Sequence, residues 1–274
     1  MNRQGTFLDQ VVLPGQLKTL YQPILSFASG PPRLLGLECL TRGPSGTNFE
    51  IADVLFEYAR RKRREELVDA ACARAALQNA GAAGEMAKLF INVHASTLGK
   101  NQFFIDSLEE ACVQQPFPLS SVVIEVVEHT PCWNRGEFAR SVTRLRDLGV
   151  QLAVDDMGVA YSSFAMILDT APEFLKIDMY ITRTCTDDPL RRAMIKSFQH
   201  LAEGCRAELI AEGIETKEEM QVVMDLGVYN LQGYLFSKPK PSAEIVRFAC
   251  EDPRLGSLPC VVQERSTSAF AGQL

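Results

Sequence analysis

Two neighbouring carboxylates, Asp155 and Asp156, directly follow a short apolar run in the stretch LAVDDMGVAYSS. Like charges at adjacent positions repel, and removing one unpaired carboxylate from water costs on the order of several kcal/mol. A positive group is therefore expected beside this pair. An Arg or Lys side chain would satisfy that requirement, and so would a metal ion.

Further polar side chains stand at or near the ends of other short apolar runs. These residues, in chain order, are Glu38, Asn92, Glu125, Glu128, Lys176, Asp178, Glu212 and Gln232. One such residue taken alone is usually a solvated loop residue. Many converging carboxylates without a cation would be strongly destabilising, so the repetition favours a charged site.

The donor types in this pattern indicate a hard cation. Carboxylate and amide oxygens, without His or Cys, select Mg²⁺ or Mn²⁺. Adjacent carboxylates suit two metal ions ~3.5–4 Å apart, which stabilise the attacking and leaving oxygens in phosphodiester cleavage. The chain has 3 His, none well placed for nucleophilic catalysis, and it contains no G-x-S-x-G, P-loop or G-x-G-x-x-G motif.

The elements that must position these residues alternate between strand-like and helix-like segments. Near-continuous apolar runs predict buried strands at 34–40, 89–93, 122–127, 152–156, 174–178, 208–213 and 231–236. Helical patterns fill the intervals, notably at 52–80, 137–149 and 217–227, the last two ending at Gly. This alternation predicts an α/β fold, best matched by a single (β/α)₈ barrel, whose active sites lie at the C-terminal strand ends.

Charge and composition restrict the partners. The chain has 274 residues, a net charge of -6 and a pI of about 5.3, so non-specific binding of DNA or RNA is not expected. The run RRKRR at 60–64 could be a nucleic-acid patch. Because it is followed by two Glu residues and lies inside the expected 52–80 helix, a solvated helix face is the preferred interpretation.

The ends of the chain and its cysteines indicate a cytoplasmic protein. Residues 1–16 lack the apolar core of a signal peptide, and no apolar run approaches the ~20 residues that span a bilayer. The eight cysteines show no metal-binding spacing and are expected to be buried free thiols in a reducing cytoplasm. We expect a leader at 1–16, a barrel at 17–250 and a polar tail at 251–274.

An ordered set of motifs resembles the EAL domain family. The motifs are YQPI (21–24), GLECLTRG (36–43), INVHASTL (91–98), IEVVEHT (124–130), DDMGVAYSS (155–163), LKID (175–178), AEGIET (211–216) and QGYLFSKP (232–239). The resemblance covers roughly residues 17–247. It implies a modified TIM (β/α)₈ barrel with one antiparallel strand, and a metal-dependent phosphodiesterase that linearises the bacterial second messenger cyclic di-GMP to pGpG.

The resemblance also implies roles for individual residues. The family's metal ligands fall on Glu38, Asn92, Glu125 and Asp155, with Asp156 at a second Mg²⁺ or Mn²⁺ ion. Lys176 matches the lysine that contacts the nucleophilic water, and Glu212 matches the general base. Glu128 matches the anchor of the loop that follows Asp156. The substrate contacts match Gln22, Leu40, Arg42, Asp178 and Gln232, of which Gln232 also lies near the metal site.

The chain departs from the family pattern at a few positions. Cys39 replaces a small Ala, with little expected effect, whereas Met157, Val159 and Ala160 change the D-D-F-G-T-G-Y-S-S loop. In the family this loop links metal binding to dimerisation, so the resemblance also implies a homodimer. Two functions remain open: an active phosphodiesterase, or a slow or inactive domain that serves as a cyclic di-GMP receptor or protein-interaction module.

Overall fold

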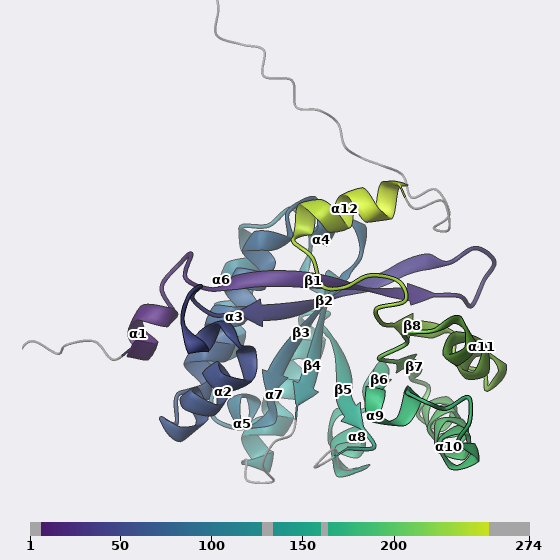
Figure 1. Ribbon diagram of the computed structural model, residues 1–274. Coiled ribbons are helices and arrows are strands. Elements are labelled where there is room, and N and C mark those ends of the chain that lie inside the picture. The colour runs from purple at the N-terminus through teal and green to yellow at the C-terminus, as the bar shows by residue number, and fades with distance from the viewer. Residues whose placement is uncertain (1–6, 128–133, 160–163, 252–274) are drawn as a thin grey trace, which may run out of the picture.

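Eight strands close into a barrel in the order β1 to β8 (Figure 1). The computed structural model describes residues 7–127, 134–159 and 164–251. β1 runs antiparallel to both of its neighbours, and the remaining adjacent pairs are parallel. The predicted α/β barrel with one antiparallel strand is confirmed. The strands are β1 (Lys18–Ser26), β2 (Arg33–Arg42), β3 (Lys88–His94), β4 (Val122–Val127), β5 (Gln151–Met157), β6 (Phe174–Ile177), β7 (Glu208–Ala211) and β8 (Asn230–Gln232).

Helices surround this barrel and fill most connections between strands (Figure 1). The α-helices are α1 (Phe7–Val11), α2 (Ala52–Arg61), α3 (Glu65–Ala80), α4 (Ala82–Met86), α5 (Ala95–Leu98), α6 (Phe103–Val113), α7 (Arg135–Asp147), α8 (Phe164–Thr170), α9 (Met179–Thr182), α10 (Pro189–Cys205), α11 (Lys217–Asp225) and α12 (Ser242–Glu251). Two 3₁₀ turns are η1 (Asn48–Glu50) and η2 (Leu119–Ser121).

Apart from their site residues, the strands are mostly apolar because both of their faces are covered. In β4, Ile124 and Val126 belong to the large cluster shared with the helices, whereas Val123 belongs to a cluster inside the barrel. That interior cluster also contains Phe90 and Phe174, whose rings meet edge-on with centroids 5.2 Å apart. This packed layer lies below the polar strand ends, so the barrel has a solid floor under its site.

Two elements of the structure differ from what the sequence predicts. β1 is absent from the expected strands, because Pro23 in its middle argues against a central strand. The single helix expected at 52–80 is wrong: α2 ends at Arg61 and α3 begins at Glu65. Arg63 lies between them with a left-handed φ of 55°, which a continuous helix cannot accommodate.

The basic run at 60–64 therefore lies at the break between α2 and α3 and not within one helix. Its arginines pair with acidic neighbours: Arg61 lies 2.8 Å from Glu57, and Arg64 lies 3.2 Å from Asp9. The second of these contacts links the break to α1. These ion pairs are typical of a solvated charged surface, which is the interpretation preferred from the sequence.

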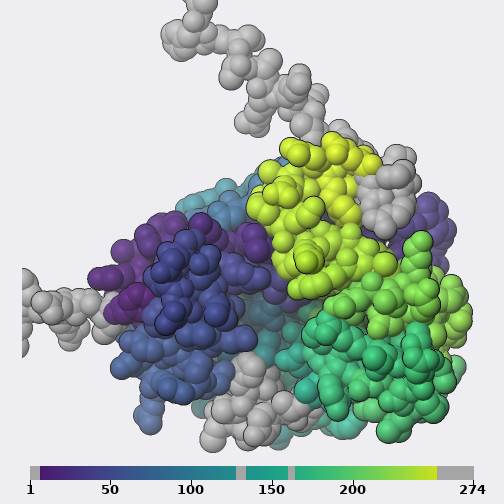
Figure 2. All heavy atoms as spheres, viewed as in Figure 1, coloured from purple at the N-terminus to yellow at the C-terminus, as the bar shows by residue number. Residues whose placement is uncertain are grey.

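The described ends of the chain pack on the barrel. On α1, Leu8 and Val11 are buried in a cluster with Leu55 of α2 and Val68 of α3. α12 lies over β1 and α4 (Figure 1) and forms the yellow part of the surface in Figure 2. The leader expected at 1–16 thus contributes a packed helix from Phe7 onward. Residues 252–274 of the expected tail lie outside the described residues.

The cysteines follow the expectation only in part. Cys39, Cys72, Cys112 and Cys185 are buried free thiols, whereas Cys205 is a free thiol that is exposed. Cys250 is disulfide-bonded, which corrects the expectation of a free thiol there. Among the described residues, no helix has both the length and the apolar composition needed to cross a bilayer.

Gly36 and Phe90 give a test of the barrel interior. Phe90→Ala should lower the free energy of unfolding by about 3–5 kcal/mol. Gly36→Ala should lower it by about 1–3 kcal/mol, because its new Cβ would lie 2.2 Å from the Phe90 ring. In the double variant most of the Gly36→Ala cost should disappear, as measured by urea denaturation.

The matched control is Val113→Ala, since Val113 is 85% exposed and its truncation should change stability by less than about 0.5 kcal/mol. Strictly additive effects of the two interior substitutions would show that Gly36 and Phe90 do not share the packing described here.

Candidate functional site

Among the residues that the structure describes, the polar side chains expected at strand ends meet at one end of the barrel. Strand register brings them level: Asn92 on β3 lies opposite Glu125 on β4, and Gln22 on β1 lies opposite Glu38 on β2. Glu125 is fully buried and Glu38 is 9% exposed. The barrel therefore presents a ring of oxygen atoms whose relative heights are set by backbone pairing.

Lys176 on β6 is the cation at the centre of this ring. Its side chain is fully buried, and its Nζ lies 2.6 Å from Glu212, 2.7 Å from Glu125, 3.4 Å from Asp155 and 3.8 Å from Glu38. One ammonium group thus contacts carboxylates from four other strands or strand ends. The sequence left open whether a basic side chain or a metal ion accompanies the aspartate pair, and the structure supplies a lysine.

The electrostatics of the cluster follow from burial and from this shared cation. Burial alone lowers the pKa of Lys176, but the surrounding carboxylates, Asp155 foremost, raise it well above its ordinary value. Burial raises the pKa of Glu125 and of Glu212 well above the usual range, and Lys176 opposes that rise in both. Lys176 therefore stays charged while its acidic neighbours compete for one positive charge.

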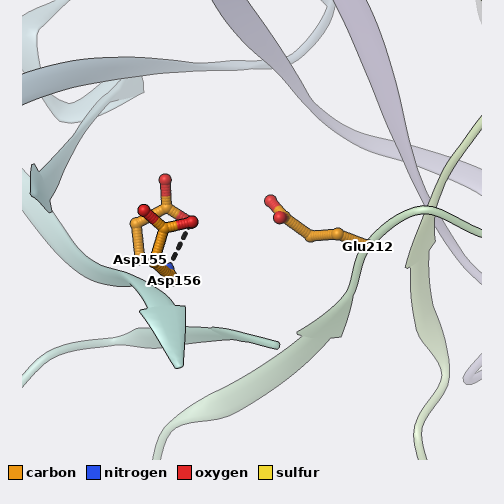
Figure 3. A group of neighbouring side chains, drawn as sticks. All are labelled: Asp155, Asp156 and Glu212. Atoms are coloured by element: carbon orange, nitrogen blue, oxygen red, sulfur yellow. Dashed lines mark hydrogen bonds between the residues drawn. The ribbon is translucent and has the colours of Figure 1, made fainter. Parts of the chain in front are cut away.

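Asp155, Asp156 and Glu212 gather close enough to share a ligand (Figure 3). One oxygen atom of each lies within 4.8 Å of the others. The Asp156 backbone adopts a left-handed φ of 55°, and its N–H donates to Asp155 Oδ1 at 2.9 Å. This turn allows two consecutive aspartates to face the same space, which an extended strand would forbid.

The residues present fit a divalent cation. Glu38, Glu125, Asp155, Asp156 and Glu212 supply five carboxylates against the single ammonium of Lys176. Among the described residues, nothing donates a hydrogen bond to Glu125 Oε2, although that atom is buried. A buried carboxylate oxygen without a donor and an excess of negative charge are both features that hard cations satisfy.

Two glutamines flank the ring on its β1–β8 side. Gln232 donates its amide N–H to Glu38 and, at 3.2 Å, to Gln22 Oε1. Gln22 in turn donates to the Ser237 carbonyl at 3.2 Å. Asn92 donates to Glu38 from the opposite side at 3.3 Å. These contacts fix the Glu38 carboxylate.

Two hollows open on either side of the aspartate pair, each with a volume of about 240 Å³. Leu40, Arg42 and Asn92 line the first, and Gln22, Glu212 and Gln232 line the second. Glu38, Asp155 and Asp156 line both. A ligand that filled the two hollows would therefore pass over the carboxylate cluster.

Among the described residues, three of the expected site residues line neither hollow. Lys176 and Glu125 are buried within the carboxylate cluster. The carboxylate of Asp178 caps α9 by accepting the Tyr180 N–H at 2.7 Å. Glu128, the expected loop anchor, lies outside the described residues, as does Ala160. Val159 is described, and its N–H donates to the Asp156 carbonyl at 3.2 Å.

Sequence reasoning missed a buried network beside the first hollow. Asp69 on α3 is fully buried and accepts the His94 N–H at 3.1 Å, His94 Nδ1 at 3.0 Å, and the Thr97 hydroxyl. Burial lowers the pKa of His94, but the Asp69 charge and hydrogen bond outweigh it and raise the pKa overall. The sequence did contain one indication of this network: Asp69 stands among apolar residues within the segment that forms α3.

Comparison with known proteins identifies the family. The EAL domain family model matches residues 8–239, and the chain belongs to the EAL domain family. The cyclic di-GMP phosphodiesterase NbdA of Pseudomonas aeruginosa is 30% identical over 250 residues, which cover 88% of this chain and 31% of that protein. Other curated relatives are matched over 30% to 37% of their length, so the chain spans a minor part of each.

Solved structures of other EAL proteins share the fold. One is a standalone versatile EAL protein from Vibrio cholerae O395 in a c-di-GMP-bound form, with a TM-score of 0.73 and 27% identity over 84% of this chain and 94% of that chain. Another is the manganese and c-di-GMP complex of BlrP1 from Klebsiella pneumoniae, with a TM-score of 0.68 and 26% identity over 84% and 57%.

Asp156 gives a pH test of the crowded carboxylates. Burial, with Asp155 as the second cause, raises the pKa of Asp156 from 3.8 to about 6. The folded state thus holds this proton more tightly than the unfolded chain does. The contribution of Asp156 to stability is full at low pH, and it is lost as pH rises from about 4 through about 6.

Asp156→Asn should therefore increase the stability of the metal-free protein at pH 7.5 and flatten its change between pH 4 and 6. Thermal unfolding in excess chelator measures this. The control is Asp147→Asn, on the outer helix α7 and away from the carboxylate cluster. A wild type and an Asp156→Asn variant with parallel pH profiles would contradict the crowding described here.

Proposed function

We propose that this chain is a metal-dependent phosphodiesterase that hydrolyses cyclic di-GMP to linear pGpG. The observation that carries the proposal is the buried Lys176, held between Glu212 and two carboxylates that face both hollows, Glu38 and Asp155. Membership in the EAL domain family and the curated name of the relative NbdA support the same reaction.

The proposed reaction divides the site between cation binding and proton transfer. Glu38, Asn92, Glu125 and Asp155, with Asp156 at a second position, would hold Mg²⁺ or Mn²⁺. When bound, these ions would supply positive charge for the phosphate oxygens and lower the pKa of water at the site. Manganese in the related BlrP1 structure supports a divalent ion.

Glu212 is proposed as the base that accepts the proton of the attacking water. Burial raises its pKa, which increases its affinity for a proton. Lys176, 2.6 Å away, holds the Glu212 carboxylate toward the cluster and would contact the same water. After the phosphorus–oxygen bond breaks, the proton passes to the leaving 3′ oxygen, and the product is a linear dinucleotide.

The two hollows suit the two halves of a cyclic dinucleotide. In the first hollow, Arg42 provides a guanidinium for a phosphate oxygen and Leu40 provides an apolar contact. In the second, Gln22 and Gln232 provide amide groups. The Asp178 carboxylate caps α9, so a substrate contact by Asp178 would be made at the N-terminus of that helix. Two related EAL structures that were solved with c-di-GMP bound support this substrate.

The alternative is a slow or inactive domain that acts as a cyclic di-GMP receptor or protein-interaction module. One observation favours it: Val159 occupies the loop after Asp156, where its side chain offers no hydroxyl. All proposed metal-binding residues are nevertheless present. The active enzyme is therefore the preferred proposal. The loop after Asp156 is the feature whose substitution can distinguish the two functions.

We also propose a homodimer in the bacterial cytoplasm, with no DNA or RNA partner. α8 follows the loop after Asp156 and exposes two large apolar side chains, Phe164 at 65% and Leu168 at 84%. Exposed apolar groups on one short helix are typical of an interaction surface. A second copy of the chain is the partner that this family's loop-linked dimerisation implies.

Chelation tests the metal requirement. Exhaustive treatment with EDTA should abolish formation of pGpG, and Mg²⁺ or Mn²⁺ should restore it. Ca²⁺ should restore it poorly, because it is larger and tolerates irregular coordination. Product is measured by liquid chromatography, with Glu38→Ala as an inactive control of unchanged or higher metal-free stability. Full turnover after chelation would rule out the metal-dependent reaction.

The loop substitutions separate the two functions. Val159→Thr combined with Ala160→Gly should raise turnover several-fold, equivalent to about 1 kcal/mol in the loop equilibrium. The affinity for cyclic di-GMP should change little, since neither residue is proposed to contact it. Binding with metal present, but no linear product from either the wild type or the double variant, would establish the receptor function instead.

Leu168→Lys tests the dimer. A charge on this exposed side chain should shift the protein toward monomer at tens of micromolar, which light scattering measures directly. Val113→Lys is the matched control, since Val113 is 85% exposed on α6. A wild-type monomer at that concentration would contradict the proposed homodimer.

A further inference from the structure

Glu219, in the first turn of α11, is a buried carboxylate that connects two loops of the catalytic face. It is 7% exposed. Its Oε2 accepts the backbone N–H groups of Glu215 at 3.0 Å and Thr216 at 3.1 Å, and its Oε1 accepts the N–H of Thr184 at 3.2 Å. The first two donors follow β7, whereas Thr184 follows α9 on the β6 side.

These two loops follow the strands that carry Lys176 and lead to Glu212, the residues proposed to move the proton. β6 ends just after Lys176, and Glu212 directly follows β7. The Thr182 hydroxyl donates to the Glu212 carbonyl, and Arg183 pairs with Glu215. Gly213 lies so close to Met179 that an added Cβ would approach the Met179 Cβ to 2.3 Å. The position of Glu212 therefore depends on how the α9 segment lies against the β7 loop.

Thr184 shows that this arrangement is held under constraint. Its φ of 57° lies in the left-handed region, which a β-branched residue rarely adopts. Its side chain is exposed, so side-chain packing does not hold it there. Two hydrogen bonds hold this conformation: the Thr184 N–H donates to Glu219, and the Thr184 carbonyl accepts the Asp187 N–H at 3.2 Å. Of these two, only the Glu219 contact reaches the β7 loop.

We propose that Glu219 is a positioning residue for the phosphodiester hydrolysis. By binding both loops, its carboxylate sets the distance between the Glu212 carboxylate and Lys176. The inference rests on the proposed function, in which Glu212 is the base. Because Glu219 lines neither hollow, its loss affects the chemical step more than substrate binding.

The experiment compares Glu219→Ala with Thr216→Ala. Thr216 caps the same helix by accepting the Glu219 N–H at 3.1 Å, so its loss weakens α11 but leaves the Glu219 carboxylate in place. Glu219→Ala should lower kcat at least about tenfold with KM within about twofold, since small displacements of a catalytic group are costly. Thr216→Ala should change kcat less than about twofold at a similar loss of thermal stability.

A second substitution tests the role of Thr184. Thr184→Gly removes the unfavourable left-handed conformation, so it should recover part of the lost kcat in the Glu219→Ala background and have little effect alone. Glu219→Gln should be intermediate, because its single carbonyl oxygen cannot replace both carboxylate oxygens. Equal losses of kcat in Glu219→Ala and Thr216→Ala would overturn the positioning role.

Hydrogen exchange supplies a readout that does not depend on turnover. In Glu219→Ala, amide protection should fall in both 182–188 and 212–216, whereas Thr216→Ala should affect only the start of α11. Unchanged protection at 182–188 in Glu219→Ala would overturn the proposal whatever the activity. An inactive wild type in which Glu219→Ala still loosens both segments would overturn the proposed function and support the connection between the loops.

Discussion

The buried ammonium group of Lys176 is the interaction on which the rest of the site depends. Carboxylates from β2, β4, β5 and the end of β7 approach within 3.8 Å of it. Without that charge, the repulsion and desolvation of these acids would oppose closure of the barrel at this end. With it, the acids are held close together yet keep an unbalanced negative charge, which is the condition for binding further cations.

The barrel turns this electrostatic requirement into fixed geometry. Backbone pairing sets Asn92 level with Glu125 and Gln22 level with Glu38, so side-chain heights do not depend on flexible loops. The interior layer with Phe90 and Phe174 closes the space below. Only after Asp155 does the chain leave regular strand geometry, where the left-handed Asp156 turns a second carboxylate to the same side.

The sequence predicted the barrel and the convergence of its strand-end residues because apolar runs and terminal polar residues are local patterns. It did not predict β1, since Pro23 argues against a central strand, or the break at Arg63, since no Gly or Pro marks it. Lys176 was expected near a water molecule. Its contact with four carboxylates could not be predicted, because it depends on closure of the barrel. Asp69 was missed because only the fold brings His94 and Thr97 to it, and Glu219 was missed because its contact with the Thr184 N–H also depends on the fold.

The reversed direction of β1 determines where the chain enters the barrel. Lys18, at the start of β1, pairs with Arg42, at the end of β2, so the preceding segment arrives at the catalytic rim and not at the opposite end. There α1 packs on α2, and α2 supplies Ala52, Asp53 and Phe56 to the wall of the first hollow. Any polypeptide joined ahead of α1 would be tethered beside the opening of the site. A displacement of α1 by such a segment would act on α2, which forms part of the wall of the first hollow.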